Sequence, residues 1–261
     1  MRGAITEYID VAQIVLYAFW AFFIGLIIYL RREDKREGYP LESDRTDRAP
    51  GVAVQGFPAM PEPKTFKLPH GGGEVSVPNN KRDQREIKLT PAEGFAGSAF
   101  NPIGNPMLDG VGPASWAERS THPELTDEGH PRMIPMRLAK GYSYFGNDPD
   151  PRGFQVIAAD GLVGGIVQES WVDIAEPQIR FLEIQVSKNG GPRNVLLPIT
   201  YVKWDIEKRA VRVRSITSAQ FADVPGLANP DQISLREEDQ ITAYYAGGTL
   251  YATPDRFGPL I

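Results

Sequence analysis

The densest group of titratable side chains lies in one short segment, THPELTDEGH, residues 121–130. It holds two histidines and three acids, namely His122, Glu124, Asp127, Glu128 and His130. Histidine has an ordinary pKa of about 6.5, so beside carboxylates it exchanges protons readily at neutral pH. The same groups would bind a divalent transition metal weakly, for example at His130 and Glu128. Two interpretations stay open for this segment: a proton-collecting patch and an ordinary solvated loop.

A second group sets ionisable side chains among apolar ones in SWVDIAEPQIRFLEI, residues 170–184. Its candidate proton-relay residues are Asp173, Glu176 and Arg180. In a strand, Asp173 shares a face with Trp171, and Pro177 interrupts the hydrogen-bond ladder near Glu176. Burial in an apolar setting raises the pKa of a carboxyl group toward neutrality, which would suit it to relay protons. A structural ion pair at the edge of a sheet is the alternative.

Composition excludes several other kinds of chemistry. There is no cysteine, so disulfides, thiolate catalysis and cysteine-ligated zinc or iron–sulfur centres are excluded. Three histidines are too few for a histidine-rich metal centre, and the net charge of -5 argues against nucleic acid as a partner. The sequence also contains no nucleophile elbow, phosphate-binding loop or dinucleotide fingerprint. These absences argue against an enzyme and against a cofactor bound by this chain alone.

Both groups lie in the part of the chain that follows one long apolar run. Residues 11–30, VAQIVLYAFWAFFIGLIIYL, carry no charge. As a helix they would span about 30 Å, the thickness of a hydrocarbon core. A signal peptide, the competing interpretation, has an apolar core of only about 7–15 residues that ends in small residues. This run is longer and is followed by Arg31 and Arg32. We therefore predict an uncleaved, single transmembrane helix over residues 11–33.

The flanks of this helix predict its orientation. The segment before it holds one basic residue, Arg2, whereas basic residues crowd the segment after it: Arg31, Arg32, Lys35 and Arg36. Short flanks rich in lysine and arginine stay in the cytoplasm. Residues 1–10 are therefore expected to form a periplasmic tail, and the large C-terminal part is expected to be cytoplasmic. Tyr29, Arg31 and Arg32 would lie among the lipid headgroups, either as simple anchors or around a bound anionic lipid.

The segment after the helix is irregular. Residues 34–64 are rich in proline, glycine and charge without apolar periodicity, which predicts an extended linker. Residues 65–150 continue this texture, with short strand candidates at 65–68, 74–77 and 86–89. So long a stretch with so little regular structure is unusual in a free domain. We therefore expect residues 65–150 to pack on partner subunits.

Residues 151–261 predict a compact domain. Five apolar or β-branched runs are separated by turn sequences, and they cover residues 154–159, 161–174, 179–186, 194–204 and 210–216. The intervening Asp160-Gly161 and Asn189-Gly190 are strong hairpin signals. A small antiparallel β-barrel accommodates this pattern. A helix should follow, begun by a capping box at Ser234 and Glu237 and ended at Gly247-Gly248. The fold class is thus α+β, with one membrane helix.

Several long motifs follow one another along almost the whole chain, namely FWAFFIGLIIYL, REGYPLE, PKTFKLPHGGG, NPMLDGVGPASWAER, HPELTDEGH, WVDIAEPQIRFLEI and LREEDQITAYYAGGTLYA. In these motifs and their order the chain resembles one family, the H subunit of the purple bacterial photosynthetic reaction centre. The resemblance implies a cytoplasmic barrel of the PRC type behind one helix that spans the intracytoplasmic photosynthetic membrane, the bacterial inner membrane. It also implies a non-catalytic subunit that takes part in photosynthetic electron transport.

The resemblance implies partners and a role as well. The H subunit caps the L and M subunits on the cytoplasmic side, beside the light-harvesting 1 antenna and membrane lipid. It binds no pigment itself, because L and M hold the bacteriochlorophyll, bacteriopheophytin, quinones, non-haem iron and carotenoid. It supports proton transfer to the secondary quinone. A membrane-anchored PRC-barrel adaptor or assembly factor without a proton-transfer role is the alternative.

Individual residues match positions of that family. Asp173 and Glu176 match its internal proton relay, and Arg180 matches a basic position that tunes their pKa values. The proton-uptake surface is matched by Glu124, His130 and His70. Glu128 stands where many members carry a second histidine, and Thr126 stands where an acid is common. Glu128 still suits proton collection, whereas the loss of an imidazole and a carboxylate ligand argues against tight zinc or cadmium binding.

Overall fold

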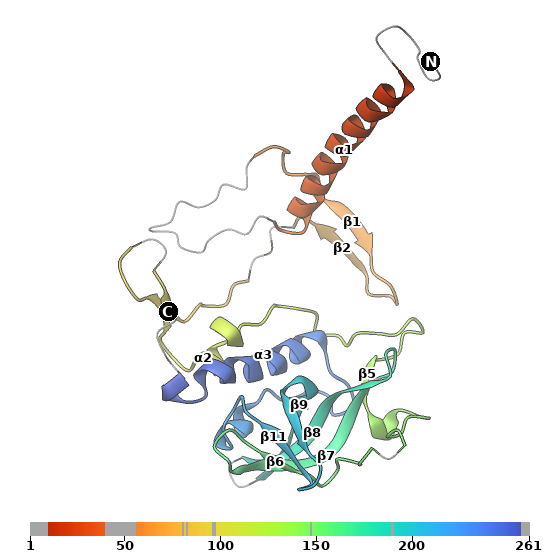
Figure 1. Ribbon diagram of the computed structural model, residues 1–261. Helices are drawn as coiled ribbons and strands as arrows, with labels where there is room; N and C mark the ends of the chain where they lie inside the picture. The colour runs from red at the N-terminus through yellow and green to blue at the C-terminus, as the bar shows by residue number, and fades with distance from the viewer. Residues whose placement is uncertain are drawn as a thin grey trace. The chain divides into compact units, whose positions relative to one another are not determined.

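The computed structural model describes residues 10–39, 56–79, 81, 83–95, 98–146, 148–188 and 191–256. The chain divides into two compact units (Figure 1). The first comprises Met1–Gln84 with Glu93–Ser98, and the second comprises Arg85–Ala92 with Ala99–Ile261. The apolar helix lies in the first unit, and both groups of titratable residues lie in the second.

The first unit begins with helix α1, Val11–Arg36. Asp10 caps its start, because its carboxylate accepts a hydrogen bond of 2.8 Å from the Gln13 amide. The helix is long and apolar enough to cross a membrane, and its large apolar side chains are exposed. It runs three residues beyond the predicted end at Glu33. The reason is local, because Arg31 and Asp34 form an i,i+3 ion pair that favours a further turn.

Two side chains at the end of α1 tie it to residues much later in the chain. Lys35 is buried and donates to the carbonyl oxygens of Gly56, at 2.8 Å, and of Pro58. Arg36 donates to the Glu62 carbonyl. Residues 40–55 of the predicted linker lie outside the described residues.

A hairpin completes the described part of the first unit. Strand β1, Lys64–Lys67, pairs antiparallel with β2, Glu74–Val77, which confirms strands near 65–68 and 74–77. The third candidate, 86–89, is wrong except for Leu89. Strand β3, Leu89–Pro91, starts there and pairs with β4, Phe100–Pro102, in the second unit.

The second unit is built on a seven-stranded sheet. Six strands follow one path, in the order β10 (Val202–Asp205), β11 (Ala210–Val213), β6 (Gln155–Ile157), β7 (Val163–Asp173), β8 (Gln178–Lys188) and β9 (Gly191–Pro198). Strand β5, Met133–Pro135, pairs with β7 as a branch. The five predicted runs all contain strands. The run 194–204 forms two, because the 3-10 turn η3, Ile199–Tyr201, separates β9 from β10.

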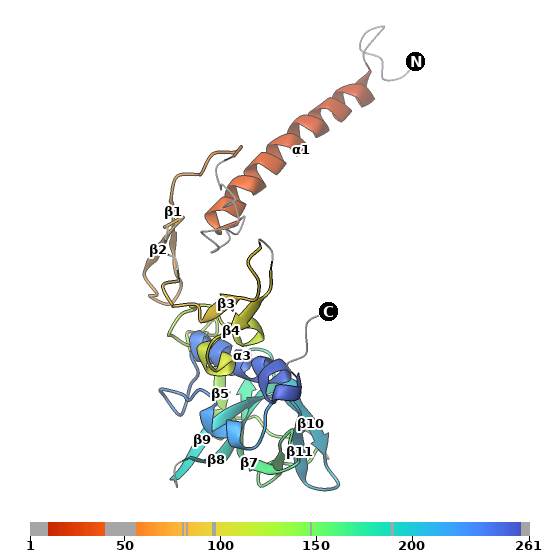
Figure 2. The ribbon, with the colours of Figure 1, turned by 90° about the vertical axis from the view of Figure 1, so that its left-hand side faces the viewer.

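The predicted antiparallel barrel is wrong in two respects. No described strand pair joins β9 to β10, so the sheet is not closed, and β11 pairs with β6 in parallel. Helix α3, Leu235–Tyr251, covers the apolar face of the open sheet instead (Figure 2). Its Ile241, Tyr244 and Tyr245 join Leu182 and Leu197 of the sheet in one buried core. Because a helix supplies this burial, the sheet does not need to close on itself.

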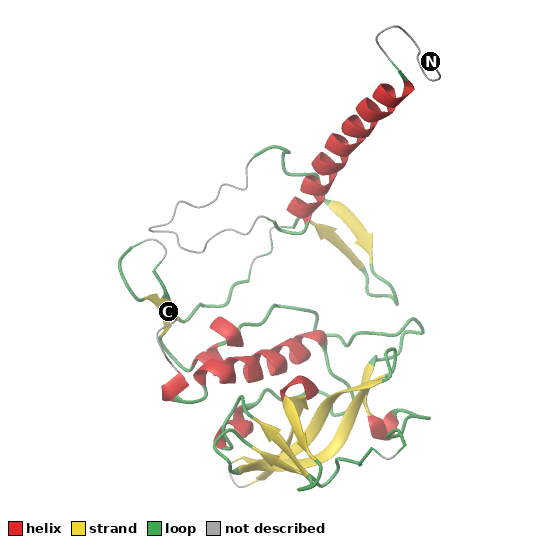
Figure 3. Cartoon of the chain, viewed as in Figure 1, coloured by secondary structure: helices red, strands yellow, loops and turns green. Residues whose placement is uncertain are grey.

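The connections before the sheet are mostly irregular (Figure 3). They include short helical turns, namely α2 (Pro106–Asp109), η1 (Gly112–Ala114) and η2 (Met136–Leu138). Two further 3-10 turns lie near α3, namely η4 (Ala219–Asp223) and η5 (Pro254–Arg256). Helix α3 packs on η1 and α2, so part of the irregular segment 65–150 belongs to the second unit's own fold.

The start of α3 is as predicted and its end is not. The Ser234 hydroxyl and the Glu237 carboxylate form the predicted capping box. The helix continues through Gly247 and Gly248 to Tyr251. A Cβ on Gly247 would lie 2.5 Å from the Ala114 side chain, and one on Gly248 would lie 2.4 Å from Ile216. The two glycines therefore allow close packing inside the helix and do not end it.

Replacing Gly248 with alanine should lower the free energy of unfolding by about 1–3 kcal/mol, because the added methyl group overpacks the contact with Ile216. In an unobstructed helix the same change would stabilise by about 1 kcal/mol. Thermal unfolding of the full chain measures the sign. Thr249→Ala, at the exposed next position, is the control and should change stability little. A stabilised Gly248→Ala variant would contradict the close contact.

Candidate functional site

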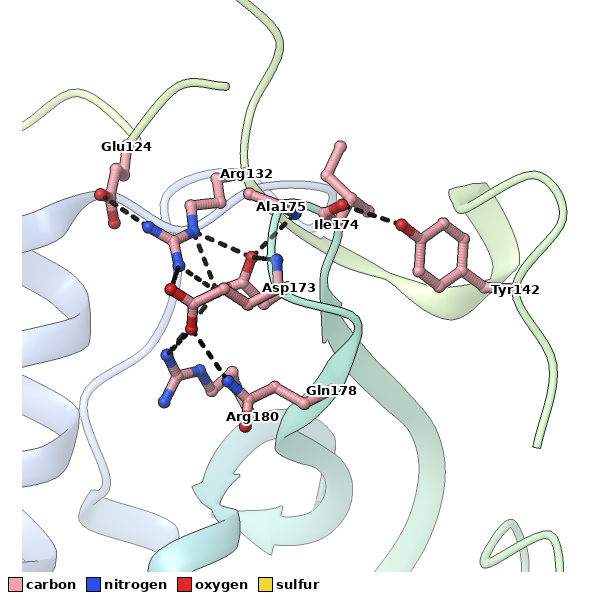
Figure 4. A network of polar contacts seen from close by, with 9 residues as sticks. Glu124, Arg132, Tyr142, Asp173, Ile174, Ala175, Gln178 and Arg180 are labelled. Atoms are coloured by element: carbon pink, nitrogen blue, oxygen red, sulfur yellow. Dashed lines mark hydrogen bonds and ion pairs between the residues drawn. The ribbon is translucent and has the colours of Figure 1, made fainter. Parts of the chain in front are cut away.

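Arg132 lies at the centre of the polar cluster in the second unit (Figure 4). Its Nε donates to both carboxylate oxygens of Asp173, at 2.8 and 2.9 Å. One of its terminal nitrogens lies 3.1 Å from Glu124, and the other lies 3.1 Å from Glu176. A single guanidinium therefore joins one acid from the predicted uptake segment to two acids from the predicted relay.

Strand pairing holds Arg132 in this position. Its amide donates to the Glu124 carbonyl at 2.8 Å, and its carbonyl accepts from Ile174 at 3.0 Å. The next residue, Met133, is the register partner of Asp173 in the β5–β7 pair. The end of β7 is thus fixed against the segment that carries Glu124. Arg132 was not predicted as a site residue. Its position between an acidic loop and the apolar run Met133-Ile134 could have indicated an arginine that pairs with those acids.

Asp173 is almost fully buried, with 1% of its surface exposed. Burial raises the pKa of its carboxyl group. The Arg132 hydrogen bonds and the amides of Glu176 and Ala175, each at 3.0 Å, lower it and prevail. The pKa of Asp173 therefore lies below its ordinary value, and the expected rise toward neutrality is wrong for this residue. A carboxylate that accepts this many hydrogen bonds stays ionised at neutral pH.

The other two predicted relay residues lie beside Asp173. Glu176 is mostly exposed, and Arg180 lies 3.5 Å from its carboxylate and 3.7 Å from that of Asp173. The structure thus brings together all three predicted relay residues. Ion pairs of these lengths at a partly exposed site are weak. Arg180 therefore contributes positive potential at the two carboxylates rather than holding them in place.

Glu238 is an acid of this cluster that the sequence analysis missed. It lies in the first turn of α3, and burial raises the pKa of its carboxyl group above the ordinary value. Glu238 and the relay residues Asp173 and Arg180 line the same small cavity of about 80 Å³. The other polar residues that line this cavity are Glu124 and Arg132. The signal was present in the sequence. Glu238 is four residues from the helix cap Ser234 and three before the buried Ile241, so it falls on the core-facing side.

The predicted uptake segment forms a tight loop closed by the Leu125–Pro131 bridge. Glu124, Glu128 and His130 are exposed and line an open recess of about 1030 Å³. Within the described part of the chain, no three acids or histidines lie close enough to hold a metal ion. Arg132, which contacts Asp173 and Glu176, also lines this recess. Its role in proton collection remains a prediction.

The remaining predicted site residues lie in the first unit. His70 is exposed in the turn between β1 and β2, so its grouping with His130 remains a prediction. Tyr29, Arg31 and Arg32 are exposed on the last turns of α1. Their contact with lipid headgroups likewise remains a prediction.

Two family models match the chain. The first, the N-terminal region of the photosynthetic reaction centre H-chain, matches residues 3–138, which is more than half of the chain. The chain belongs to the reaction centre H-chain family. The second, the PRC-barrel domain, matches residues 146–220 and covers the six strands of the main sheet path.

These matches confirm the resemblance found in the sequence. An H chain is in general terms a non-catalytic subunit of a photosynthetic reaction centre, so this chain has partner subunits. Its single apolar helix α1 is consistent with membrane association. Arg132 lies in the H-chain region and Asp173 in the PRC region, so the polar cluster forms where the two matched regions meet.

Proposed function

We propose that this H chain caps the L and M subunits on the cytoplasmic side of the intracytoplasmic photosynthetic membrane and supports proton transfer to the secondary quinone. The observation that best supports this proposal is the network of ion pairs around Arg132. It connects Glu124 at the open recess with Asp173 and Glu176 at the end of β7. An ion pair that served stability alone would not need the five acids that line the recess and the cavity, namely Glu124, Asp127, Glu128, Asp173 and Glu238.

The residues of the network divide into two chemical roles. Asp173 stays ionised and holds the Arg132 guanidinium in place, which fixes the electric field of the cluster. Burial raises the pKa of the Glu238 carboxyl group, which suits this residue to take up a proton and pass it on. We assign proton entry to the exposed residues Glu124, Glu128 and His130, and the relay to Glu176 beside Arg132. Quinone reduction by two electrons consumes the protons that this surface supplies.

The capping role is supported by exposed apolar side chains in the irregular part of the chain. Ile103, Leu108 and Phe145 of the second unit are 62%, 56% and 87% exposed. Phe57 and Phe95 of the first unit are 84% and 59% exposed. Side chains of this size on a free surface favour a partner that covers them. We assign this contact to L and M, with the light-harvesting 1 antenna as a further neighbour.

The pigments and redox groups are assigned to the partner subunits. The three histidines, His70, His122 and His130, are exposed, where an axial ligand to a buried pigment is not expected. We therefore place bacteriochlorophyll, bacteriopheophytin, quinones, non-haem iron and carotenoid on L and M.

Capture of the full chain in mild detergent should co-purify near-infrared bacteriochlorophyll absorption in proportion to the chain. A PRC-barrel adaptor would be recovered without pigment in stoichiometric amount. A mock capture from cells with the untagged chain controls for carry-over. Recovery of the chain in pigment-free form alone would exclude the reaction centre assignment.

The orientation of α1 gives a separate expectation. The basic residues that follow it favour a periplasmic N-terminus and a cytoplasmic main part. Trypsin added to inverted membranes should therefore cut within residues 37–64 once partner subunits are stripped away, whereas right-side-out vesicles should protect this segment. The fragments are read on a denaturing gel. Cleavage only in right-side-out vesicles would reverse the orientation.

A further inference from the structure

A second polar site lies away from the Arg132 network, on strands β10 and β11. Lys203 and Arg212 are direct cross-strand partners in the β10–β11 pair. Like charges directly opposite each other are destabilising. Asp205 offsets part of this, because it accepts from Arg212 at 2.9 and 3.1 Å. Arg214 follows two residues after Arg212 and is exposed. Lys203 and Arg214 thus add positive charge that this carboxylate does not neutralise.

Arg256 adds a fourth cation and is held rigidly. Its guanidinium donates to the carbonyl oxygens of Ser215 at 2.9 Å, Gly248 at 2.7 Å and Arg214 at 3.0 Å. These three partners are neutral, so they orient the guanidinium without cancelling its charge. Asp255, the adjacent acid, is exposed, accepts a hydrogen bond from Thr253 and interacts with the Arg256 charge, but it does not line the recess. A guanidinium carries five N–H donors, so this one keeps donors for a ligand.

These cations line one recess of about 450 Å³. Its other polar lining residues carry hydroxyl groups, namely Thr200, Tyr201, Ser215 and Thr249, and no acid among the described residues lines it. This is unusual for a chain with a net charge of -5. The Ser215 hydroxyl is buried and has no hydrogen-bond partner among the described residues. A buried polar group is normally satisfied, so an unpartnered hydroxyl in the wall points to a missing ligand.

We propose that this recess binds a phosphate group. Arginine forks match the oxygens of a phosphate, and the recess combines three arginines and a lysine with the hydroxyl groups of its wall. The volume is sufficient for more than the phosphate itself. A soluble phosphate compound and the headgroup of an anionic phospholipid present the same chemistry. The site is independent of the proton-transfer proposal, because it shares no residue with the Arg132 network.

The test uses the full chain in the complex with which it purifies. Pyrophosphate binding is measured by isothermal titration calorimetry, and bound lipid is measured by mass spectrometry after exchange into nanodiscs of phosphatidylglycerol or phosphatidylcholine. The variant is Lys203→Gln with Arg214→Gln, because both side chains are exposed and Arg256 stays intact. The control, Lys208→Gln with Lys67→Gln, also removes two positive charges at exposed positions outside the recess. Equal melting temperatures of the two variants establish that the fold is retained.

We expect the recess variant, and not the control, to bind its ligand at least about tenfold more weakly, because charge-assisted hydrogen bonds are lost. A loss confined to pyrophosphate identifies a soluble phosphate compound. A loss confined to phosphatidylglycerol, with phosphatidylcholine unaffected, identifies a lipid headgroup. Equal binding by both variants in both measurements, or no binding by the unaltered complex, would overturn the site.

Discussion

Replacing Arg132 with methionine should lower the free energy of unfolding by about 3 kcal/mol at pH 8, since removing one partner of a buried ion pair strands the other charge. Asp173 keeps only 1% of its surface exposed, and its carboxylate would retain two backbone amides as partners. Arg132 is itself partly exposed, with 20% of its side chain accessible. The value is therefore placed at the lower end of the range for buried pairs.

The loss should depend on pH in a defined direction. In the unaltered chain the pKa of Asp173 is lowered, so its ionised form stabilises the fold above the unfolded-state pKa, and this stability is lost as pH falls through the folded-state pKa. Without Arg132, burial becomes the larger influence and raises that pKa. The variant is then penalised at neutral and alkaline pH, and the penalty fades as pH falls toward about 4. Thermal unfolding at pH 8, 6 and 4.5 measures this difference.

Two controls separate this effect from the loss of any surface ion pair. Arg137 forms an exposed pair with Asp231 at 2.7 Å, so Arg137→Met should cost less than about 1 kcal/mol at every pH. Combining Arg132→Met with Asp173→Asn removes the stranded charge, so the double variant should lose the pH dependence. An Arg132→Met variant that behaves like Arg137→Met would show that the network contributes little to stability.

The relay proposal predicts an equally large effect on function. Glu176→Gln and Glu238→Gln keep side-chain size and remove the titratable proton. In each, the second electron transfer to the secondary quinone, which is coupled to proton arrival, should slow by at least about tenfold. The first electron transfer and the pigment spectrum should change little. Flash-induced absorbance at successive turnovers measures both steps in the intact complex.

The Glu238 variant also carries a signature that a structural change would not produce. Burial raises the pKa of Glu238, so the unaltered complex should lose rate as pH rises through that pKa, and Glu238→Gln should flatten this slope. Glu238→Asp should keep part of the rate, and small weak acids should partly restore it in Glu238→Gln. Glu207→Gln, at an exposed turn, is the matched control. Unchanged second turnovers in both relay variants would eliminate this role.

Elements set by local signals could be predicted from the sequence. The apolar run predicted α1, and the Ser234–Glu237 capping box predicted the start of α3. The predicted hairpin is confirmed by the pairing of β8 with β9 up to Lys188 and Gly191, whereas Asn189 and Gly190 themselves lie outside the described residues. These features depend on a few neighbouring residues, so composition and spacing suffice.

Features that depend on contacts between distant segments could not be predicted in the same way. Arg132 and Asp173 are 41 residues apart in the sequence. They come into contact only because β5 pairs with β7. From the sequence, Gly247 and Gly248 indicate the end of a helix. Their role in close packing becomes clear only from the positions of Ala114 and Ile216 in the structure. The open sheet likewise follows from the helix that covers it. In each case tertiary packing decides between two uses of the same local sequence.

The contacts of Lys35 and Arg36 have a consequence for the covalent continuity of the chain. These two cations fasten the end of α1 to Gly56, Pro58 and Glu62 without using the peptide bonds between residues 40 and 55. These side-chain contacts and the covalent chain are therefore two separate links between the end of α1 and residues 56–62, and the first of them is made by two cations alone.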